Sequence, residues 1–189
     1  MCVKKCKIAL TGGIGTGKTY LSRHFVEMGI PVFYADVEAK KLYQEPAFIA
    51  TLCDTFGQGM LQADGTVDLR KMGAMVFADE EKLQILNKLI HPRVMQMFEE
   101  WAAQQSSTAV IMETAIVYEA NLTGYFDKII VADAPLELRI RRIQQRDPHL
   151  TREDILQRIA RQMPQEEKCS RADLVICTGE TYQEAMAMR

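Results

Sequence analysis

This sequence of 189 residues lacks the marks of several protein classes. Its five cysteines are odd in number and form no Cys-x-x-Cys pair, so they suggest neither a disulfide framework nor a zinc site. No stretch approaches the roughly 20 apolar residues of a membrane span, and the apolar run near the N-terminus is too short for a secretion signal. We therefore expect a cytoplasmic protein with reduced thiols and no membrane partner.

An excess of charge of one sign is also missing. The sequence has 23 basic and 25 acidic residues, a net charge of −2 and an isoelectric point near 6.0. This balance gives no general attraction to nucleic acid, so a local cluster of basic residues must hold any anionic ligand. Repeats, low-complexity tracts and Gly/Ser linkers are lacking as well. With 48% hydrophobic residues, the chain fits one domain that exists as a monomer or a weak homo-oligomer.

What the sequence does contain is one strong motif, Gly-Gly-Ile-Gly-Thr-Gly-Lys-Thr at residues 12–19. It matches the phosphate-binding loop, in which glycines let successive backbone N–H groups face one concavity at the start of a helix. The flanking residues fit, because 7–11 have the pattern of a short buried strand and 20–28 that of a helix. The motif predicts a nucleoside triphosphate site, with Lys18 along the β- and γ-phosphates and Thr19 as a ligand of Mg²⁺. A Gly-rich turn without function is the alternative.

Short apolar runs separated by helical patterns predict the fold. Besides residues 7–11, such runs occupy 31–34, 109–112, 128–132 and 173–177. Runs of this kind are typical of parallel strands that are buried on both faces. The sequence therefore predicts an α/β protein with a doubly wound parallel sheet of about five strands, whose ligands bind beyond the carboxyl ends of the strands.

Two acidic residues follow strands at that edge. Asp36 comes just after the run 31–34 and is a candidate general base toward a substrate hydroxyl, although capping the next helix is an alternative role. Glu113 ends the run 109–112, where it is placed to approach Mg²⁺ through water or to bind the substrate. A plain surface position at the end of a strand is the alternative for Glu113.

The chain divides into three expected regions. A nucleotide-binding core is expected from residues 1–36, 108–138 and 172–189, and a helical lid from residues 139–171. The long insert 37–107 is expected to be mainly helical and to receive the second substrate. Within it we expect helix starts at Pro46, after Asp79 as an N-cap, and after His91–Pro92.

Basic residues of the lid are candidates for charge stabilisation. Arg142 and Arg146 are four residues apart, hence on one helical face, and a guanidinium there can neutralise charge on a transferred phosphoryl group. A solvated helix face is the alternative. His91 has no visible partner, so a structural role is the first interpretation and positioning of a substrate the second.

Several motifs, in this order along the chain, resemble those of the dephospho-CoA kinase family. They are Thr11 to Thr19, Ala35-Asp36, Leu89-Ile90-His91-Pro92, Arg142-x-x-x-Arg146-Asp147 and Ala172-Asp173-x-Val175-Ile176. The resemblance covers nearly the whole chain. It implies a P-loop kinase fold and ATP-dependent phosphorylation of the ribose 3′-hydroxyl of dephospho-CoA, which gives coenzyme A and ADP as the last step of coenzyme A biosynthesis.

The resemblance also implies roles for individual residues. Asp36 is implied as the base, with Lys18 and Arg142 acting on the transferred phosphoryl group. Dephospho-CoA is implied to contact Asp36, His91, Glu113 and Glu119. ATP is implied to contact Gly13, Ile14, Gly15, Thr16, Gly17, Lys18, Thr19, Tyr20, Arg142 and Arg146, with Thr19 as the ligand of Mg²⁺. Four positions depart from the family pattern: Tyr34 and Glu113 replace Asp, Ala115 replaces Pro, and Thr178 replaces Asn.

Two other functions stay open on the sequence alone. Another small-molecule kinase, acting on a nucleotide, a nucleoside or a shikimate-like acceptor, would share the phosphate loop, and motifs say little about the insert that sets the acceptor. A GTP-dependent switch is a rival from another class. Against it, residues 87–90 read Asn-Lys-Leu-Ile and lack the aspartate of a guanine-reading Asn-Lys-x-Asp element.

Overall fold

A five-stranded sheet forms the centre of the computed structural model, which describes residues 5–179. Its strands are β1 (Cys6–Thr11), β2 (Val32–Tyr34), β3 (Ala109–Glu113), β4 (Lys128–Asp133) and β5 (Leu174–Cys177), in the order β2-β3-β1-β4-β5. The pairings of β1 with β3 and β4, and of β4 with β5, are parallel. The predicted doubly wound α/β fold is therefore confirmed.

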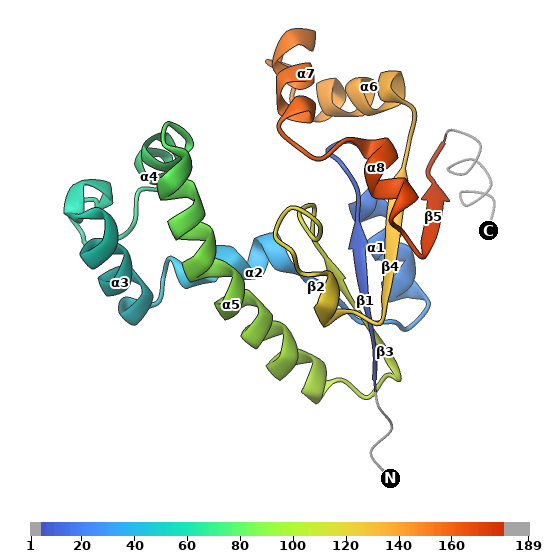
Figure 1. The fold of residues 1–189 in the computed structure, drawn as a ribbon, viewed down its shortest axis with the longest axis horizontal. Helices are drawn as coiled ribbons and strands as arrows, with labels where there is room; N and C mark the ends of the chain where they lie inside the picture. The colour runs from blue at the N-terminus through green and yellow to red at the C-terminus, as the bar shows by residue number, and fades with distance from the viewer. Residues whose placement is uncertain (1–4, 180–189) are drawn as a thin grey trace. The chain divides into compact units, whose positions relative to one another are not determined.

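The helices are α1 (Lys18–Glu27), α2 (Ala35–Leu42), α3 (Pro46–Phe56), α4 (Leu69–Phe77), α5 (Glu80–Gln104), α6 (Leu136–Arg146), α7 (Arg152–Ala160) and α8 (Gln165–Ser170), with short 3₁₀ turns at Gln58–Met60 and Thr123–Tyr125. Helix α1 joins β1 to β2, helices α2 to α5 lie between β2 and β3, and helices α6 to α8 lie between β4 and β5 (Figure 1). Among residues 5–179, no helix combines the length and the apolar character that crossing a lipid bilayer requires.

The chain folds into two compact units. One, the sheet unit, contains residues 5–33 and 105–179 of the described chain, and the other, the helical unit, is the continuous stretch Tyr34–Gln104. Residues 139–171, expected as a lid, belong to the sheet unit, and part of the expected core segment 172–189 lies outside the described residues. Each unit has its own buried side chains and is described by itself.

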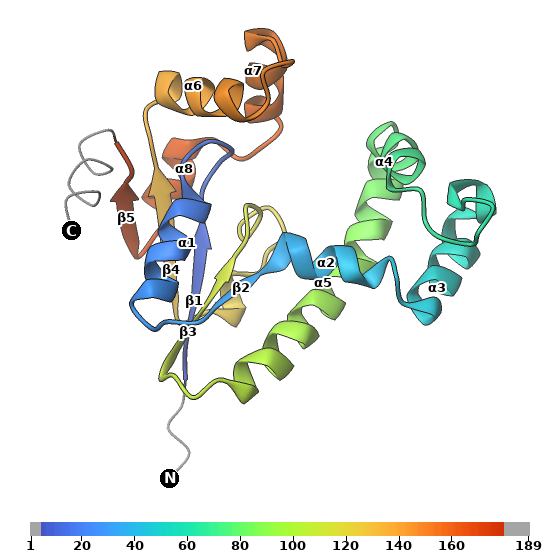
Figure 2. The same ribbon diagram turned by 180° about the vertical axis from the view of Figure 1, so that it is seen from behind.

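Apolar side chains on the central strands build the core of the sheet unit. Leu10, Ile111 and Ile130 pack with Leu21 of α1, and each of these side chains is at least nine-tenths buried. Figures 1 and 2 show α1 on one face of the sheet and α8 on the other. Because both faces are covered, the middle residues of β1, β3 and β4 are apolar on both faces, which is the pattern that the sequence displays.

The helical unit corrects one expectation. A helix was expected to begin after His91–Pro92, but α5 runs without interruption from Glu80 to Gln104 with Pro92 inside it. A proline in a helix removes one backbone hydrogen bond and costs about 3 kcal/mol. Burial of Phe98 and other apolar side chains of α5 against α2 and α4 offsets this cost, because each fully buried side chain contributes about 1.5–3 kcal/mol. The expected starts at Pro46 and after Asp79 are confirmed.

Helices α6 and α7 lie beyond the edge of the sheet at which β4 ends (Figures 1 and 2). Helix α7 starts with a capping box, in which Thr151 accepts from the Asp154 N–H while the Asp154 carboxylate accepts from the Thr151 N–H. The two helices share a core of Ile140, Ile143 and Ile155, and Ile14 of the phosphate loop packs against it. Apolar contacts of Ile14 therefore join the phosphate loop to α6 and α7.

Candidate active site

The phosphate loop connects β1 to α1 and leaves the start of that helix open. Gly17 is the N-cap of α1 and has the left-handed backbone conformation (φ 86°), and no side chain caps the helix. The backbone N–H groups of the first helical turn cannot bond within the helix, and together with the helix dipole they favour an anion. Lys18 lies along the loop, since its ammonium donates to the carbonyls of Gly12 (2.7 Å) and Gly13 (3.2 Å).

Glu113, at the end of β3, faces two hydroxyl groups of α1. Its carboxylate accepts hydrogen bonds from Thr19 Oγ1 at 3.2 Å and from Ser22 Oγ at 2.6 Å. Glu113 is half-buried and bonded to two side chains of α1. Parallel pairing of β1 with β3 brings these groups together, because it places the end of β3 beside the start of the loop. A hydroxyl and a carboxylate thus meet at the first turn of α1.

Arg142 of α6 contacts the other side of the loop. Its Nη1 donates to Thr178 Oγ1 at 3.0 Å, and the Thr178 hydroxyl donates to the carbonyl of Thr16. Arg142 also approaches the carbonyl of Gly15 at 3.4 Å. Arg146, predicted to act with Arg142, instead forms an ion pair with Asp147 at 2.8 Å on the surface, and its side chain is 62% exposed.

Asp36 and His91 lie in the helical unit. Asp36 is in the first turn of α2, but the N-cap is Tyr34 and no side chain caps this helix, so the capping role considered for Asp36 is wrong. The Asp36 side chain is exposed and has no hydrogen-bond or ion-pair partner among the described residues. His91 is half-buried in α5, and this burial lowers its pKa below the ordinary 6.5, which favours the neutral imidazole.

A cavity of about 300 Å³ opens in the helical unit between α3 and α5. Its lining combines apolar side chains with two cations: Ala47, Phe48, Thr51, Lys88, Leu89, Pro92 and Arg93. Arg93 also pairs with Glu45 at 2.9 Å. Such a lining suits a ligand that has both an apolar part and a negative charge. His91, although adjacent in sequence, is not among the lining residues.

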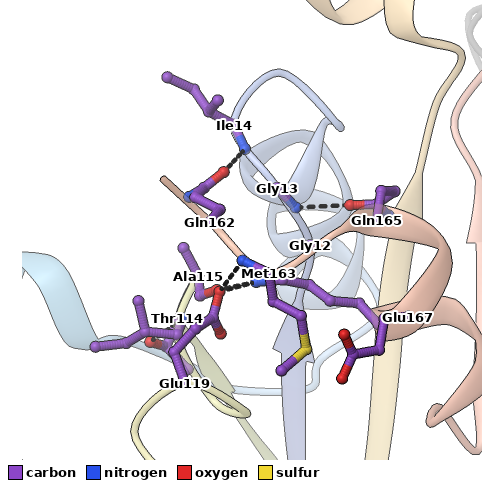
Figure 3. A network of polar contacts seen from close by, with 12 residues as sticks. Gly12, Gly13, Ile14, Thr114, Ala115, Glu119, Gln162, Met163, Gln165 and Glu167 are labelled. Atoms are coloured by element: carbon purple, nitrogen blue, oxygen red, sulfur yellow. Dashed lines mark hydrogen bonds and ion pairs between the residues drawn. The ribbon is translucent and has the colours of Figure 1, made fainter. Parts of the chain in front are cut away.

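Glu119 takes part in a buried polar network (Figure 3). Its carboxylate pairs with the ammonium of Lys168 at 2.6 Å and accepts from the Met163 N–H at 3.1 Å. Lys168 is fully buried and also donates to the carbonyl of Ala115 at 2.7 Å. The structure therefore gives Glu119 an internal partner.

Tyr20, another predicted contact of ATP, has its ring against that of His24 on α1.

Sequence reasoning missed three side chains that contact the loop. Arg139 is 5% exposed, and its Nε donates to the carbonyl of Ile14 at 3.0 Å. Burial lowers the pKa of Arg139, and the nearby Asp133 carboxylate opposes this shift. Gln162 and Gln165 accept hydrogen bonds from loop N–H groups. The cluster of arginines in α6 was a signal for Arg139, but no motif marked either glutamine.

The parallel sheet, the phosphate loop at its carboxyl edge and the arginine-bearing helices beyond that edge define a P-loop kinase. Comparison with known protein families identifies the family of kinases. The family described as Dephospho-CoA kinase matches residues 6–184, which is nearly the whole sequence. The chain belongs to the dephospho-CoA kinase family.

Curated relatives and solved structures agree with this assignment. The dephospho-CoA kinase of Bacteroides fragilis strain YCH46 is 38% identical over 172 residues, which cover 90% of this chain and 83% of the relative. That of Bacillus licheniformis is 38% identical over 174 residues, covering 89% and 86%. A crystal structure of TT1252 from Thermus thermophilus has a TM-score of 0.84 at 29% identity and covers 97% of both chains.

Two further structures show how far the likeness extends. Dephospho-CoA kinase from Campylobacter jejuni has a TM-score of 0.61 at 25% identity and covers 96% of this chain and 92% of its own. Shikimate kinase from Bacteroides thetaiotaomicron shares the fold, with a TM-score of 0.51 at 16% identity, covering 91% of this chain and 86% of its own. The resemblance to dephospho-CoA kinases inferred from the motifs is confirmed, and the family assignment sets aside a GTP-dependent switch.

Proposed function

We propose that this chain transfers the γ-phosphoryl group of ATP to the ribose 3′-hydroxyl of dephospho-CoA, giving coenzyme A and ADP. The observation that carries this proposal is the family match over residues 6–184, which includes an intact phosphate loop at the uncapped start of α1. Phosphoryl transfer depends mainly on positioning and on electrostatic stabilisation. The roles of individual residues therefore follow from where their charges and hydrogen-bond donors lie.

On the nucleotide side, Lys18 and Arg142 supply positive charge. Lys18 extends along the loop toward Gly12 and Gly13, a path that brings an ammonium to the β- and γ-phosphates of a triphosphate in the cradle. Arg142 is held by Thr178 beside Gly15, so we assign it to ATP binding next to the loop. Arg146 reaches the phosphates only if its surface ion pair with Asp147 opens.

The first turn of α1 also fits a magnesium ion. Mg²⁺ prefers oxygen ligands and commonly takes one or two from the protein, with phosphate oxygens and water completing the shell. The Thr19 hydroxyl and the Glu113 carboxylate, 3.2 Å apart, supply oxygen atoms of this kind and would hold the ion. Within residues 5–179, no group of three or more His, Cys, Asp and Glu side chains could hold a metal by itself. When bound, Mg²⁺ would neutralise charge on the β- and γ-phosphate oxygens.

On the acceptor side, we assign Asp36 as the general base. Its exposed carboxylate lacks a partner among the described residues, so nothing in this part of the chain competes for the proton of a bound hydroxyl. We assign the cavity of the helical unit to dephospho-CoA, because Lys88 and Arg93 can face its diphosphate while Phe48 and Leu89 contact apolar parts. His91 stands on the same helix as Lys88 and Arg93 and is assigned to positioning.

The test is phosphoryl transfer by the purified protein, with MgATP and either dephospho-CoA, shikimate or a nucleoside as acceptor. We expect ADP release that depends on dephospho-CoA and a product heavier by one phosphoryl group in mass analysis. Asp36→Asn should lower kcat by about 10²-fold or more, because general base catalysis contributes 10²–10⁴-fold. Lys18→Ala should lower it at least as much.

A matched control lies one half-turn away on the same helix. Glu38 of α2 pairs with Lys41 on the surface, and Glu38→Gln removes one carboxylate without touching Asp36. We expect Glu38→Gln to keep the wild-type kcat. Full turnover by Asp36→Asn would remove Asp36 from the mechanism, and transfer to shikimate but not to dephospho-CoA would overturn the proposed acceptor.

A further inference from the structure

Two glutamine side chains flank the phosphate loop, and both come from the segment that joins α7 to α8. Gln162 Oε1 accepts a hydrogen bond from the Ile14 N–H at 2.8 Å, and Gln165 Oε1 accepts one from the Gly13 N–H at 3.0 Å. Figure 3 shows them reaching the loop from opposite sides. The first two N–H groups after Gly12 are thus bonded to side chains.

The two glutamines differ in what their Nε2 groups do. Gln165 is buried, and its Nε2 donates to the carbonyl of Ala132 at 2.9 Å, so both ends of its amide are bonded within the protein. Gln162 is half-buried, and its oxygen must face Ile14 because a backbone N–H can only donate. Its Nε2 has no hydrogen-bond partner among residues 5–179. One amide with two donor hydrogens is therefore left beside the loop.

The position of Gln162 is fixed by its neighbours in the chain. Met163, the next residue, donates its N–H to Glu119, whose carboxylate is paired with the buried Lys168. Gln165 attaches the same segment to Gly13. These bonds hold the segment on both sides of the Gln162 side chain, so its amide is placed before any ligand binds.

Ile14, like Gln162, is held in place by its neighbours. Its carbonyl accepts from Arg139 Nε at 3.0 Å, and its side chain packs against the isoleucine core of α6 and α7. Both polar groups of the Ile14 backbone are therefore engaged, the N–H by Gln162 and the carbonyl by Arg139. The bond from Ile14 sets the direction of the Gln162 amide.

The path of Lys18 shows which end of a bound triphosphate lies here. In a phosphate loop the lysine reaches the β- and γ-phosphates, while the N–H groups at the helix start hold the phosphates nearer the nucleoside. The Lys18 ammonium lies at the carbonyls of Gly12 and Gly13, directly before Ile14 in the chain. The loop near Ile14 is therefore the end that receives the terminal phosphate.

We propose that Gln162 is a further substrate-binding residue, whose Nε2 donates a hydrogen bond to the terminal phosphate of ATP. This inference rests on the proposed function only in taking ATP as the nucleotide. The terminal phosphate is the group that is transferred, so Gln162 would bind the group that leaves for the acceptor. A neutral amide serves here because it donates while its oxygen also holds the loop.

The test compares the affinities of the whole protein for MgATP and MgADP, measured by calorimetry. ADP lacks the terminal phosphate. Removing a side chain that contacts this phosphate should therefore lower the affinity for ATP and leave the affinity for ADP unchanged. We expect Gln162→Ala to weaken the binding of ATP by about tenfold, which is the effect of losing a hydrogen bond to a charged group. The binding of ADP should weaken by less than about twofold. Gln162→Glu keeps an oxygen for the Ile14 N–H but sets a carboxylate against the phosphate, so it should weaken ATP further.

Gln165→Ala is the matched control, since Gln165 also bonds the loop but donates its amide N–H groups within the protein, to the Ala132 carbonyl and to Cys169 Sγ at 3.6 Å. Gln165→Ala should weaken the binding of ATP and the binding of ADP to the same extent. Equal losses for both nucleotides in the Gln162 variants, or no loss in either, would overturn the proposal. Each variant is used only if its thermal unfolding stays cooperative, and the Glu variant decides the matter if the Ala variant does not fold. Failure of the wild type to phosphorylate dephospho-CoA would overturn the proposed acceptor, while the ATP-to-ADP ratio would still decide the role of Gln162.

Discussion

Arg142 of α6 and Thr178, the residue directly after β5, are joined by a hydrogen bond of 3.0 Å between Nη1 and Oγ1. The Thr178 hydroxyl in turn donates to the carbonyl of Thr16 in the phosphate loop. In this chain a threonine hydroxyl therefore makes the link between Arg142 and the loop. One side chain thus connects α6, β5 and the loop.

The first prediction concerns that hydroxyl. Thr178→Val keeps the shape of the side chain but removes the hydroxyl, which leaves the carbonyl of Thr16 and one N–H of Arg142 without this partner. We expect KM for ATP to rise several-fold and the free energy of unfolding to fall by about 1–3 kcal/mol. Steady-state kinetics and urea denaturation measure the two effects. Thr178→Ser keeps the hydroxyl and should stay near the wild type; a loss as large as that of Thr178→Val would mean that the hydroxyl is not the specific cause.

The second prediction concerns close packing at Gly15. A Cβ at Gly15 would lie 2.7 Å from the backbone oxygen of Arg139, closer than real contacts allow, so Gly15→Ala must displace the loop from α6. Gly29 has nearly the same backbone angle (φ 79° against 81°) but open space around it, so Gly29→Ala measures the conformational strain alone. We expect Gly15→Ala to raise KM for ATP at least about tenfold and Gly29→Ala to leave it unchanged. Equal effects would mean that the steric contact does not matter.

The third prediction concerns the pH dependence of stability. Burial lowers the pKa of His91 in the folded protein below the ordinary 6.5, so the unfolded chain binds a proton at this residue more readily. The contribution of His91 to stability is therefore present above pH 6.5 and is lost as the pH falls from 6.5 through the lower folded-state pKa. Urea denaturation between about pH 7.5 and 5.5 should show this loss. His91→Gln should flatten the slope, and an unchanged slope would contradict the prediction.

The fourth prediction concerns the pair of Lys168 and Glu119. Removing one partner of a buried pair costs about 3–5 kcal/mol when the charge that stays is fully buried. Lys168 is fully buried whereas the Glu119 side chain is 26% exposed, so Glu119→Ala should destabilise the protein more than Lys168→Met. Denaturant unfolding of the two variants and of the double variant measures the difference. The reverse order would mean that the bonds of the Lys168 ammonium, including the one to the Ala115 carbonyl, matter more than the cost of leaving its charge unpaired.

The strands and the phosphate loop could be predicted because their determinants are contiguous. The motif at residues 12–19 and the apolar runs contain within a few residues the glycines or β-branched side chains that fix the local backbone. Glu113 could also be placed near Thr19, since parallel strands end at one edge of a sheet. Pro92 was misjudged because local rules do not include the packing of α5, which outweighs the lost hydrogen bond.

The contacts that complete the site could not be predicted. Gly13 and Gln165 are 152 residues apart in sequence, and Ile14 and Gln162 are 148 apart. Glutamine is an ordinary residue of exposed helices, so nothing local distinguishes one that bonds a distant loop. The same holds for Lys168, which lies in a short helix that also carries Glu166 and Glu167, yet is fully buried against Glu119. Only the folded chain brings these residues together.

The helical unit is one uninterrupted stretch, Tyr34–Gln104, placed between two strands of the sheet unit. Five residues that form hydrogen bonds with the phosphate loop and the first turn of α1 belong to the sheet unit: Glu113, Arg139, Arg142, Gln162 and Gln165. Natural insertion or recombination at its two ends can therefore exchange the assigned acceptor site and leave the phosphate-binding machinery untouched. In a kinase with this chain order, a change of acceptor requires the replacement of one continuous segment and no change in the residues that hold ATP.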